Sequence, residues 1–356
     1  MVEVAPSTQY MPTTDPPHDL GPIVRIGTTD VRIGTCSWAD ASLTKDASWY
    51  PRKSMKAAER LAYYAARFPV VEVDSTYYFP PTPELAVSWV ERTPEHFVMD
   101  VKAWSLLTGH PTFAHSLWED LHDEVKPEFR DKRNLYAKHL SPDAVDECWN
   151  RFRHALAPLH EADKLGAVLL QYPEWFGPKP AHRDMILDAV EMLVPYPCLI
   201  EFRNAKWLTG HECDSTLSFL EENRLTFVCV DEPQGFASSM PPVLAATNGL
   251  GVIRFHGHND ENWNRRGITA AERFMYRYDD SELQHWSKRL REFAPSVDTL
   301  HILFNNCWQD YGVTNAATMI DLLGPHGASP HDDGLGRVGS SMDQRTGVGH
   351  DQPSVG

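Results

Sequence analysis

Charged residues that could carry out acid–base chemistry recur inside short β-rich runs of the sequence. Glu72, Lys102, Glu201 and His256 each follow an apolar residue near the C-terminal end of such a run. Two carboxylates that flank a substrate can act as acid and base, and a histidine can carry protons near neutral pH. A lysine whose pKa is lowered by burial can act as a base or an imine-forming nucleophile. These four residues are the candidate catalytic set.

Residues that could hold a substrate occupy equivalent positions. Arg203 and Arg254 could bind a carboxylate or phosphate through paired hydrogen bonds, and Gln171 and Asn305 add amide groups. Flat aromatic faces around a polar opening suit stacking on a sugar ring or a nucleobase, although tryptophans also pack loops onto barrels. The candidate substrate-binding set is Trp38, Tyr77, Gln171, Arg203, Trp207, Arg254 and Asn305. Further aromatic residues at or just after strand ends are Tyr78, Trp104, Trp175, Trp263 and Trp308.

The elements that must position these residues alternate between β-rich runs and amphipathic stretches. The predicted strands are residues 32–37, 70–76, 97–103, 167–172, 198–203, 226–231, 252–257 and 300–305. Predicted helices include residues 55–68, 144–162, 183–193, 214–223, 280–293 and 315–323. Eight alternating units predict a single (β/α)8 TIM-type barrel, in which the C-terminal ends of the strands carry the chemistry.

The two faces of the predicted strands differ in polarity. Side chains alternate between faces along a strand, so one apolar face should meet the helices. The opposite, inward face carries Glu72, Asp74, Asp100, Lys102, Gln171, Glu201, Arg203, Asp231, Arg254, His256 and Asn305. Because barrel interiors are normally filled with branched apolar residues, this set predicts either a ligand site or a self-satisfied ionic core.

Three segments fall outside the alternation. Residues 105–143 are too long for a simple loop and predict an insertion after the third strand. Residues 1–29 and 325–356 are rich in polar residues, Pro or Gly and are expected to be flexible tails around a domain at 30–324. The second tail contains GLGRVG at 334–339, which matches a dinucleotide-binding pattern, but no predicted strand precedes it and no helix follows.

Composition narrows the class of protein. The 356 residues contain no apolar run of 18, and the N-terminus lacks the pattern of a secretory signal. The formal net charge of −16 argues against nucleic-acid and anionic-membrane partners, and a small-molecule substrate is expected instead. Six cysteines without a CxxC pair favour free thiols and a cytoplasmic location.

Several motifs together resemble one family. In order they are GTCSW (34–38), VEVDSTY (71–77), WVERTP (89–94), VKA (101–103), LTGHP (107–111), LLQYP (169–173), IEFR (200–203) with Trp207, IRFHG (253–257) and FNN (304–306). Residues 31–323 thereby resemble the YecE-like family, domain of unknown function 72. The resemblance implies a TIM-type barrel without an assigned reaction. It also implies that Glu72, Lys102, Gln171, Glu201, Arg203, Arg254 and His256 occupy the family's characteristic positions. Asp74 stands where members usually have Asn, and Cys36 where relatives often have Ser.

Three hypotheses about function follow. The leading one is cofactor-free acid–base catalysis, by a hydrolase, lyase or isomerase, on a small polar or anionic, sugar-like substrate. A retaining glycosidase would need a carboxylate pair elsewhere, because Gln171, Arg254 and His256 end the fourth and seventh strands. The second is a divalent-metal isomerase or phosphoesterase with Glu72, Glu201, Asp231 and His256 as ligands. The third is a protein that binds an anionic metabolite without catalysis.

Overall fold

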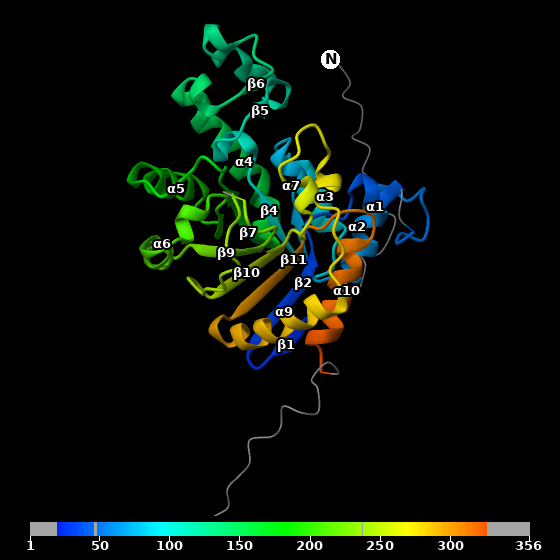
Figure 1. Ribbon diagram of the computed structural model, residues 1–356. Helices are drawn as coiled ribbons and strands as arrows, with labels where there is room; N and C mark the ends of the chain where they lie inside the picture. The colour runs from blue at the N-terminus through cyan, green and yellow to red at the C-terminus, as the bar shows by residue number, and fades with distance from the viewer. Residues whose placement is uncertain (1–19, 46–47, 237, 326–356) are drawn as a thin grey trace, which may run out of the picture.

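Eight parallel strands close into a barrel in the computed structural model, which describes residues 20–45, 48–236 and 238–325 (Figure 1). The barrel strands are β2 (Thr29–Thr35), β3 (Val70–Val73), β4 (Val98–Lys102), β7 (Leu165–Gln171), β8 (Cys198–Glu201), β9 (Thr226–Asp231), β10 (Leu250–Phe255) and β11 (Thr299–Phe304). Neighbours in sequence pair in parallel around the ring, and β11 and β3 both pair with β2. The predicted (β/α)8 architecture is confirmed.

Helices surround the barrel and cover the apolar outer face of the strands (Figure 1). They are α1 (Ala41–Lys45), α2 (Ala57–Ala65), α3 (Pro83–Glu91), α4 (Pro142–Glu161), α5 (Pro180–Leu193), α6 (His211–Glu222), α7 (Asp260–Trp263), α8 (Ala270–Arg273), α9 (Asp280–Phe293) and α10 (Tyr311–Leu323). The helix starts carry sequence signals: Ser141 caps α4 ahead of Pro142, and Asp279 with Glu282 forms a capping box on α9. Among the described residues between β9 and β10 there is no helix.

The first strand of the fold lies within the predicted N-terminal tail. Strand β1 (Val24–Ile26) pairs antiparallel with β2 through a tight turn in which Gly27 has φ +60°. The tail boundary at residue 29 is therefore wrong. A strand of three residues is too short to show a recognisable alternation of apolar and polar side chains. The remainder of both predicted tails, residues 1–19 and 326–356, lies outside the described residues.

The predicted insertion after the third barrel strand is a separate lobe that projects away from the barrel (Figure 1). It contains the two-stranded pair β5 (Thr112–Phe113) and β6 (Asn134–Leu135) and ends where α4 begins. Its 3₁₀ turns are Ser105–Thr108, Ala114–Ser116, Glu119–Glu124, Pro127–Phe129 and Ala137–His139. The 3₁₀ turns outside the insertion are Ser75–Tyr77, Ala205–Leu208 and Ala294–Ser296. None of the helices in the described residues is long and apolar enough to cross a membrane.

One tyrosine bridges strands β2 and β3, at which the barrel closes. Strands β2 and β3 share only two register pairs, and Gly34 lies opposite Val70 there. A Cβ on Gly34 would approach the Val70 carbonyl oxygen to 2.0 Å, so only glycine fits this seam. The buried hydroxyl of Tyr64 on α2 donates to the Val70 carbonyl oxygen at 3.1 Å and accepts from the Thr35 backbone N–H at 2.7 Å. This hydroxyl joins the two strands where the ladder between them is short.

One of the predicted inward charges, Asp100, contacts a buried histidine deep in the barrel. Asp100 Oδ2 lies 2.8 Å from His301 Nδ1, and both side chains are buried. Gly166 on β7 makes room for this pair, because a Cβ there would lie 2.4 Å from Asp100 Oδ1. The strand register shifts next to Asp100. The inward-polar prediction therefore holds: His301 satisfies Asp100 Oδ2, whereas Asp100 Oδ1 has no hydrogen-bond partner among the described residues.

Candidate functional site

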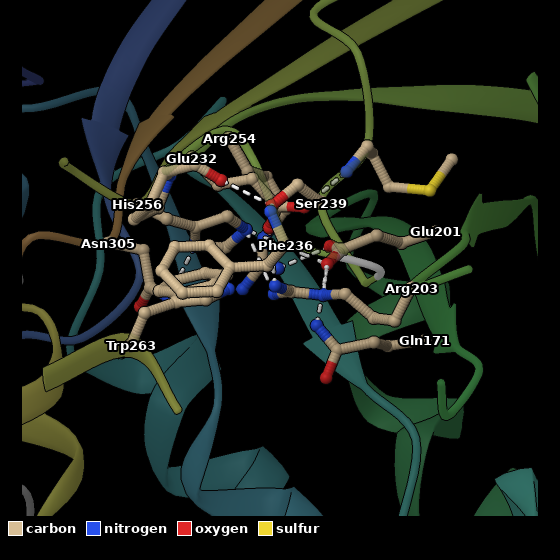
Figure 2. A network of polar contacts seen from close by, with 12 residues as sticks. Gln171, Glu201, Arg203, Glu232, Phe236, Ser239, Arg254, His256, Trp263 and Asn305 are labelled. Carbon is tan, nitrogen blue, oxygen red and sulfur yellow. Dashed lines mark hydrogen bonds and ion pairs between the residues drawn. The ribbon is translucent and has the colours of Figure 1, made fainter. Parts of the chain in front are cut away.

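Arg254 occupies the centre of the barrel and contacts carboxylates from two other strands. Its Nε lies 2.7 Å from Glu72 Oε2 and its Nη2 lies 2.6 Å from Glu72 Oε1. Its Nη1 donates to Glu201 Oε2 (Figure 2). All three side chains are buried, and the thiol of Cys36 lies 3.8 Å from Nη2. The guanidinium pairs with both carboxylates without any ligand, as the ionic-core alternative anticipated.

Arg203 forms the next level of the same network, closer to the mouth (Figure 2). Its Nε pairs with Glu201 Oε1 at 2.7 Å and its Nη1 with Glu232 Oε2 at 2.7 Å. Its Nη2 lies 3.0 Å from His256 Nε2. On the other side of the ring, His256 Nδ1 lies 2.9 Å from the Asn305 amide nitrogen. Protein groups thus surround the guanidinium that was predicted to clamp an anion.

The pKa values of the titratable groups in this network are shifted in different directions. Burial would raise the pKa of Glu201, but the guanidiniums of Arg254 and Arg203 outweigh it and hold that pKa well below the usual value. Burial raises the pKa of Glu72 despite Arg254, and it raises the pKa of Glu232 to about 7. Burial and the charge of Arg203 lower the pKa of His256 well below its ordinary value. His256 is therefore neutral at physiological pH.

This geometry does not support the roles predicted for three of the four candidate catalytic residues. Glu72 and Glu201 do not flank a substrate, because Arg254 joins them below the cavities and neither lines a cavity wall. His256 is buried, does not titrate near neutral pH and also lines neither cavity. Lys102 is the member of the set that reaches a cavity.

The Lys102 cavity opens above the network at the C-terminal ends of the strands. Its volume is about 290 Å³. Polar and charged groups line it: Ser37, Asp40, Asp74, Ser75, Lys102, Gln171, Arg203, Arg254 and Asn305. Trp38, Tyr78 and Phe274 supply aromatic walls. The mixture of hydrogen-bonding groups and flat apolar faces suits a small polar ligand.

The aromatic cavity adjoins it and shares Gln171, Arg203 and Phe274 with it. It measures about 490 Å³ and its wall includes Tyr77, Tyr136, Trp175 and Trp263. His110, Pro111 and Tyr136 come from the insertion, and Trp263, Asn264, Arg273 and Phe274 come from the segment after β10. The two segments thus contribute opposite parts of one mouth.

Lys102 differs from the other cations of the mouth. Arg203 and Arg254 have carboxylate partners, and Arg273 donates to the backbone carbonyls of Trp263 and Arg265. Within the described chain, the Lys102 ammonium forms no ion pair or hydrogen bond and instead lies 4.5 Å from the centroid of the Tyr77 ring. Burial and the nearby charge of Arg254 lower the pKa of Lys102.

Asp74 lines the same cavity and complements Lys102. Burial and the charge of Glu72 raise the pKa of Asp74 to about 7. A carboxyl group with this pKa can both donate and accept a proton near neutral pH. The sequence placed Asp74 on the inward face but did not assign it a role. Its raised pKa depends on how deeply it and its neighbours are buried, which the strand pattern alone does not predict.

The predicted substrate-binding residues separate into two groups. Trp38, Gln171, Arg203, Arg254 and Asn305 line the Lys102 cavity, and Tyr77 lines the aromatic cavity. Trp207 does not reach the mouth: it is 0% exposed, stacks on Phe202 at 4.3 Å between centroids, and donates its Nε1–H to the Phe176 carbonyl oxygen. The prediction for Trp207 is wrong, because the turn after β8 folds inward and buries the ring.

The cavity residues that were missing from the predicted binding set include His110, Trp175, Trp263 and Phe274. The two tryptophans were visible as aromatics at strand ends, and His110 lies in the LTGHP motif. Phe274 carried no signal, because it lies nineteen positions beyond the strand that precedes it in a segment of irregular structure.

The four proposed metal ligands do not converge on one point, although Glu201 Oε1 lies 3.6 Å from His256 Nε2. Glu72 and Glu201 contact Arg254, whereas Asp231 Oδ2 accepts from the Tyr278 hydroxyl at 2.6 Å and lies 2.9 Å from His258 Nε2. Within residues 20–45, 48–236 and 238–325, no three His, Cys, Asp or Glu side chains converge as metal ligands would. The four residues do not form the predicted site.

Comparison with known proteins identifies relatives of this barrel. The profile of the family described as "Protein of unknown function DUF72" matches residues 32–335. The UPF0759 protein YunF of Bacillus subtilis (strain 168) is 31% identical over 298 residues, which cover 82% of this chain and 94% of YunF. A crystal structure of a DUF72 family protein from Enterococcus faecalis V583 superposes with a TM-score of 0.63 at 26% identity, covering 82% of this chain and 97% of that one. One from Thermotoga maritima MSB8 gives 0.63 at 25% identity, covering 82% and 98%. The chain belongs to the DUF72 family.

Proposed function

We propose that this protein is an enzyme that performs acid–base chemistry on a small, polar, anionic substrate at the C-terminal mouth of its barrel. The observation that carries the proposal is the position of Lys102, a cationic side chain on a cavity wall without an ion-pair partner among the described residues. Perturbed titratable groups that converge in a cleft are typical of active sites. Sugar acids and sugar phosphates are the substrate classes that fit.

The pairing within the network leaves one cation available for an anionic substrate. Glu72 and Glu201 are paired with Arg254, and Arg203 is placed between Glu201 and Glu232. Lys102 stands outside these pairs, so a ligand carboxylate or phosphate can contact its ammonium directly. Gln171 uses its amide N–H for Glu201, at 2.6 Å, which leaves its amide oxygen to accept a ligand hydroxyl.

The proton transfers are assigned to Lys102 and Asp74. A lysine with a lowered pKa is a better base than a free lysine, and a carboxyl with a pKa of about 7 can return the proton. Arg254, Glu72 and Glu201 then act as positioning residues that fix the floor of the cavity. Because family members usually carry Asn at position 74, the contribution of Asp74 is specific to this chain.

The cytoplasmic location and the absence of nucleic-acid and membrane partners remain part of the proposal. All six cysteines are free, which agrees with a reducing compartment. The net charge of −16 disfavours polyanionic partners.

The test uses proton exchange with solvent. The protein is incubated in D₂O with gluconate, glucuronate, ribose 5-phosphate or glucose 6-phosphate, and ¹H NMR follows product formation and the loss of C–H signals. We expect exchange or turnover with at least one compound, its loss in Lys102→Met, and full retention in Lys206→Met, whose side chain is exposed. Equal rates in Lys102→Met and wild type would remove Lys102 from the mechanism. Saturable binding without exchange would favour the non-catalytic binding protein.

A further inference from the structure

The surroundings of the Lys102 amine fit a nucleophile as well as a base. Lys102 ends strand β4 and reaches the cavity wall, while the ring of Tyr77 lies beside its ammonium. A lysine that serves as a covalent catalyst needs an apolar or cationic environment, free access to a substrate, and a nearby proton donor. Each of the three requirements can be compared with the structure.

The environment disfavours the charged form of the amine. Burial is the main cause, and Arg254, which lines the same cavity, adds a nearby positive charge. The carboxylates of Glu72, Glu201 and Asp74 favour the ammonium, but they do not outweigh these two effects. Burial and the charge of Arg254 lower the pKa of Lys102, which raises the fraction of neutral amine at pH 7. The face of the Tyr77 ring favours the cation, and the direction of the shift shows that it is outweighed.

Access and proton transfer are provided by the cavity itself. The space of about 290 Å³ admits a molecule of a few carbon atoms, and Asp74 lines it together with Lys102. A carboxyl that is partly protonated at neutral pH can protonate a departing hydroxyl group. Ser37, Ser75 and Asn305 lie on the same walls and can bind hydroxyl or acid groups of the ligand.

From this arrangement we propose that Lys102 forms an imine with a small carbonyl substrate that also carries a carboxylate or phosphate group. The inference rests on the proposed function and names its substrate class: 2-oxo acids and phosphorylated aldehydes or ketones. The neutral amine attacks the carbonyl carbon and a C–N bond forms. The carbonyl electron pair moves to oxygen, which takes up the proton lost from nitrogen.

The resulting carbinolamine loses water. Asp74 protonates the hydroxyl group, the C–O bond breaks, and the nitrogen lone pair forms the C=N bond of a protonated imine. One carbonyl oxygen leaves as water and no oxidant or reductant is needed. The positive imine then withdraws electrons from the adjacent carbon, which makes proton removal there easier. Acid–base chemistry at that carbon is the chemistry already proposed for this mouth.

Reductive trapping tests the imine directly. The full-length protein is treated with sodium cyanoborohydride and either pyruvate or dihydroxyacetone phosphate, and labelled lysines are mapped by peptide mass spectrometry. We expect a reduced adduct on Lys102 at least tenfold more abundant than on the exposed Lys206. Lactate, which lacks a ketone, should give no adduct, and neutral propanal should favour Lys102 over Lys206 less than the anionic carbonyl compounds do.

Two variants separate this inference from the proposed function. Lys102→Arg keeps the positive charge without a nucleophilic amine at pH 7, so it should retain anion binding by calorimetry and lose trapping. Asp74→Asn should slow trapping while leaving the adduct on Lys102. If wild type binds pyruvate or dihydroxyacetone phosphate through Lys102 but gives no adduct, the imine is excluded and the proposed function stands. Labelling spread evenly over exposed lysines would also exclude the imine. Neither binding nor labelling would overturn both.

Discussion

Arg254 and Glu72 form a two-point ion pair across the barrel, although 182 positions separate them in the sequence. The Nε–Oε2 distance is 2.7 Å and the Nη2–Oε1 distance is 2.6 Å, with both side chains buried. Paired hydrogen bonds between a guanidinium and a carboxylate fix orientation as well as distance. Because Arg254 also binds Glu201, one side chain links strands β3, β8 and β10 beneath the cavity floor.

Removing the guanidinium should destabilise the fold strongly. Arg254→Met leaves Glu72 buried without its partner and leaves Glu201 with Arg203 alone. The loss of one member of a buried ion pair costs about 3–5 kcal/mol. Urea unfolding monitored by tryptophan fluorescence would measure the change. Arg224→Met, at an exposed arginine, is the matched control and should stay within about 0.5 kcal/mol of wild type. Equal midpoints for the two variants would show that the central network contributes nothing to stability.

Asp74 should lower stability as the pH rises. Its folded pKa is raised to about 7 from an ordinary value near 3.8, so between these two values the folded state holds a proton that the unfolded chain releases. Stability is therefore present at low pH and is lost as the pH rises through about 7. We expect Asp74→Asn to stabilise the protein at pH 8 by on the order of 2–4 kcal/mol, and less at pH 5.

Thermal unfolding of wild type and Asp74→Asn at pH 5, 6, 7 and 8 would measure this difference. Asp188→Asn, at an exposed carboxylate on α5, serves as the control. Under the proposed function, Asp74→Asn also reduces turnover, so gained stability and lost activity should occur together. A difference in stability that does not change with pH would contradict the assigned pKa.

The sequence predicted the barrel well because its signals are local. Apolar alternation along each strand, as in Val71 and Val73 around Glu72, identified the strands and their inward faces, and caps such as Ser141 marked helix starts. Strand β1 was missed, since three residues on a hairpin give almost no periodic signal.

The site could be predicted only in part, because pairing is not a local property. Sequence alternation showed that Glu72, Glu201 and Lys102 point inward, but it could not show which of them Arg254 would engage. The pairing with Arg254 distinguishes Glu72 and Glu201, which are buried in ion pairs, from Lys102, which lines the cavity. Trp207 illustrates the same limit: its position after a strand suggested the mouth, and the direction of the following turn buried it instead.

Trp175 and Trp207 should respond in opposite ways to the same substitution. Trp175 is 54% exposed on the wall of the aromatic cavity, whereas Trp207 is fully buried between Phe176 and Phe202. We expect Trp207→Ala to cost about 3–5 kcal/mol of unfolding free energy. Trp175→Ala should cost less than about 1 kcal/mol and instead weaken binding of the substrate by the loss of a stacking surface.

Urea unfolding of both variants, with calorimetric titration of whichever sugar acid or sugar phosphate binds wild type, would measure these effects. Each variant is the control for the other, because the same ring is removed. A large loss of stability in Trp175→Ala would mean that this ring is structural. Unchanged ligand affinity in that variant would remove the aromatic cavity from the binding site.

His258 should hold the segment after β10 more firmly at low pH. Its Nε2 lies 2.9 Å from Asp231 Oδ2 and its Nδ1 lies 3.3 Å from Glu282 Oε1. The hydroxyls of Tyr278 and Tyr276 contact the same two carboxylates. Burial opposes the charged imidazole, and the carboxylates outweigh it, so the pKa of His258 is raised. The stabilisation is therefore present below the ordinary histidine pKa and is lost as the pH rises through the folded value.

Hydrogen exchange of residues 257–278, the segment that brings Trp263 and Phe274 to the mouth, measures this effect. After correction for the intrinsic pH dependence of exchange, we expect greater protection at pH 6 than at pH 8.5. His258→Gln should remove most of this difference, and His285→Gln, at an exposed position on α9, should preserve it. If the corrected protection is the same at both pH values in wild type, the charged imidazole does not fasten this segment. If His258→Gln keeps the difference, another titrating group is responsible, because the glutamine cannot gain the positive charge that both carboxylates favour.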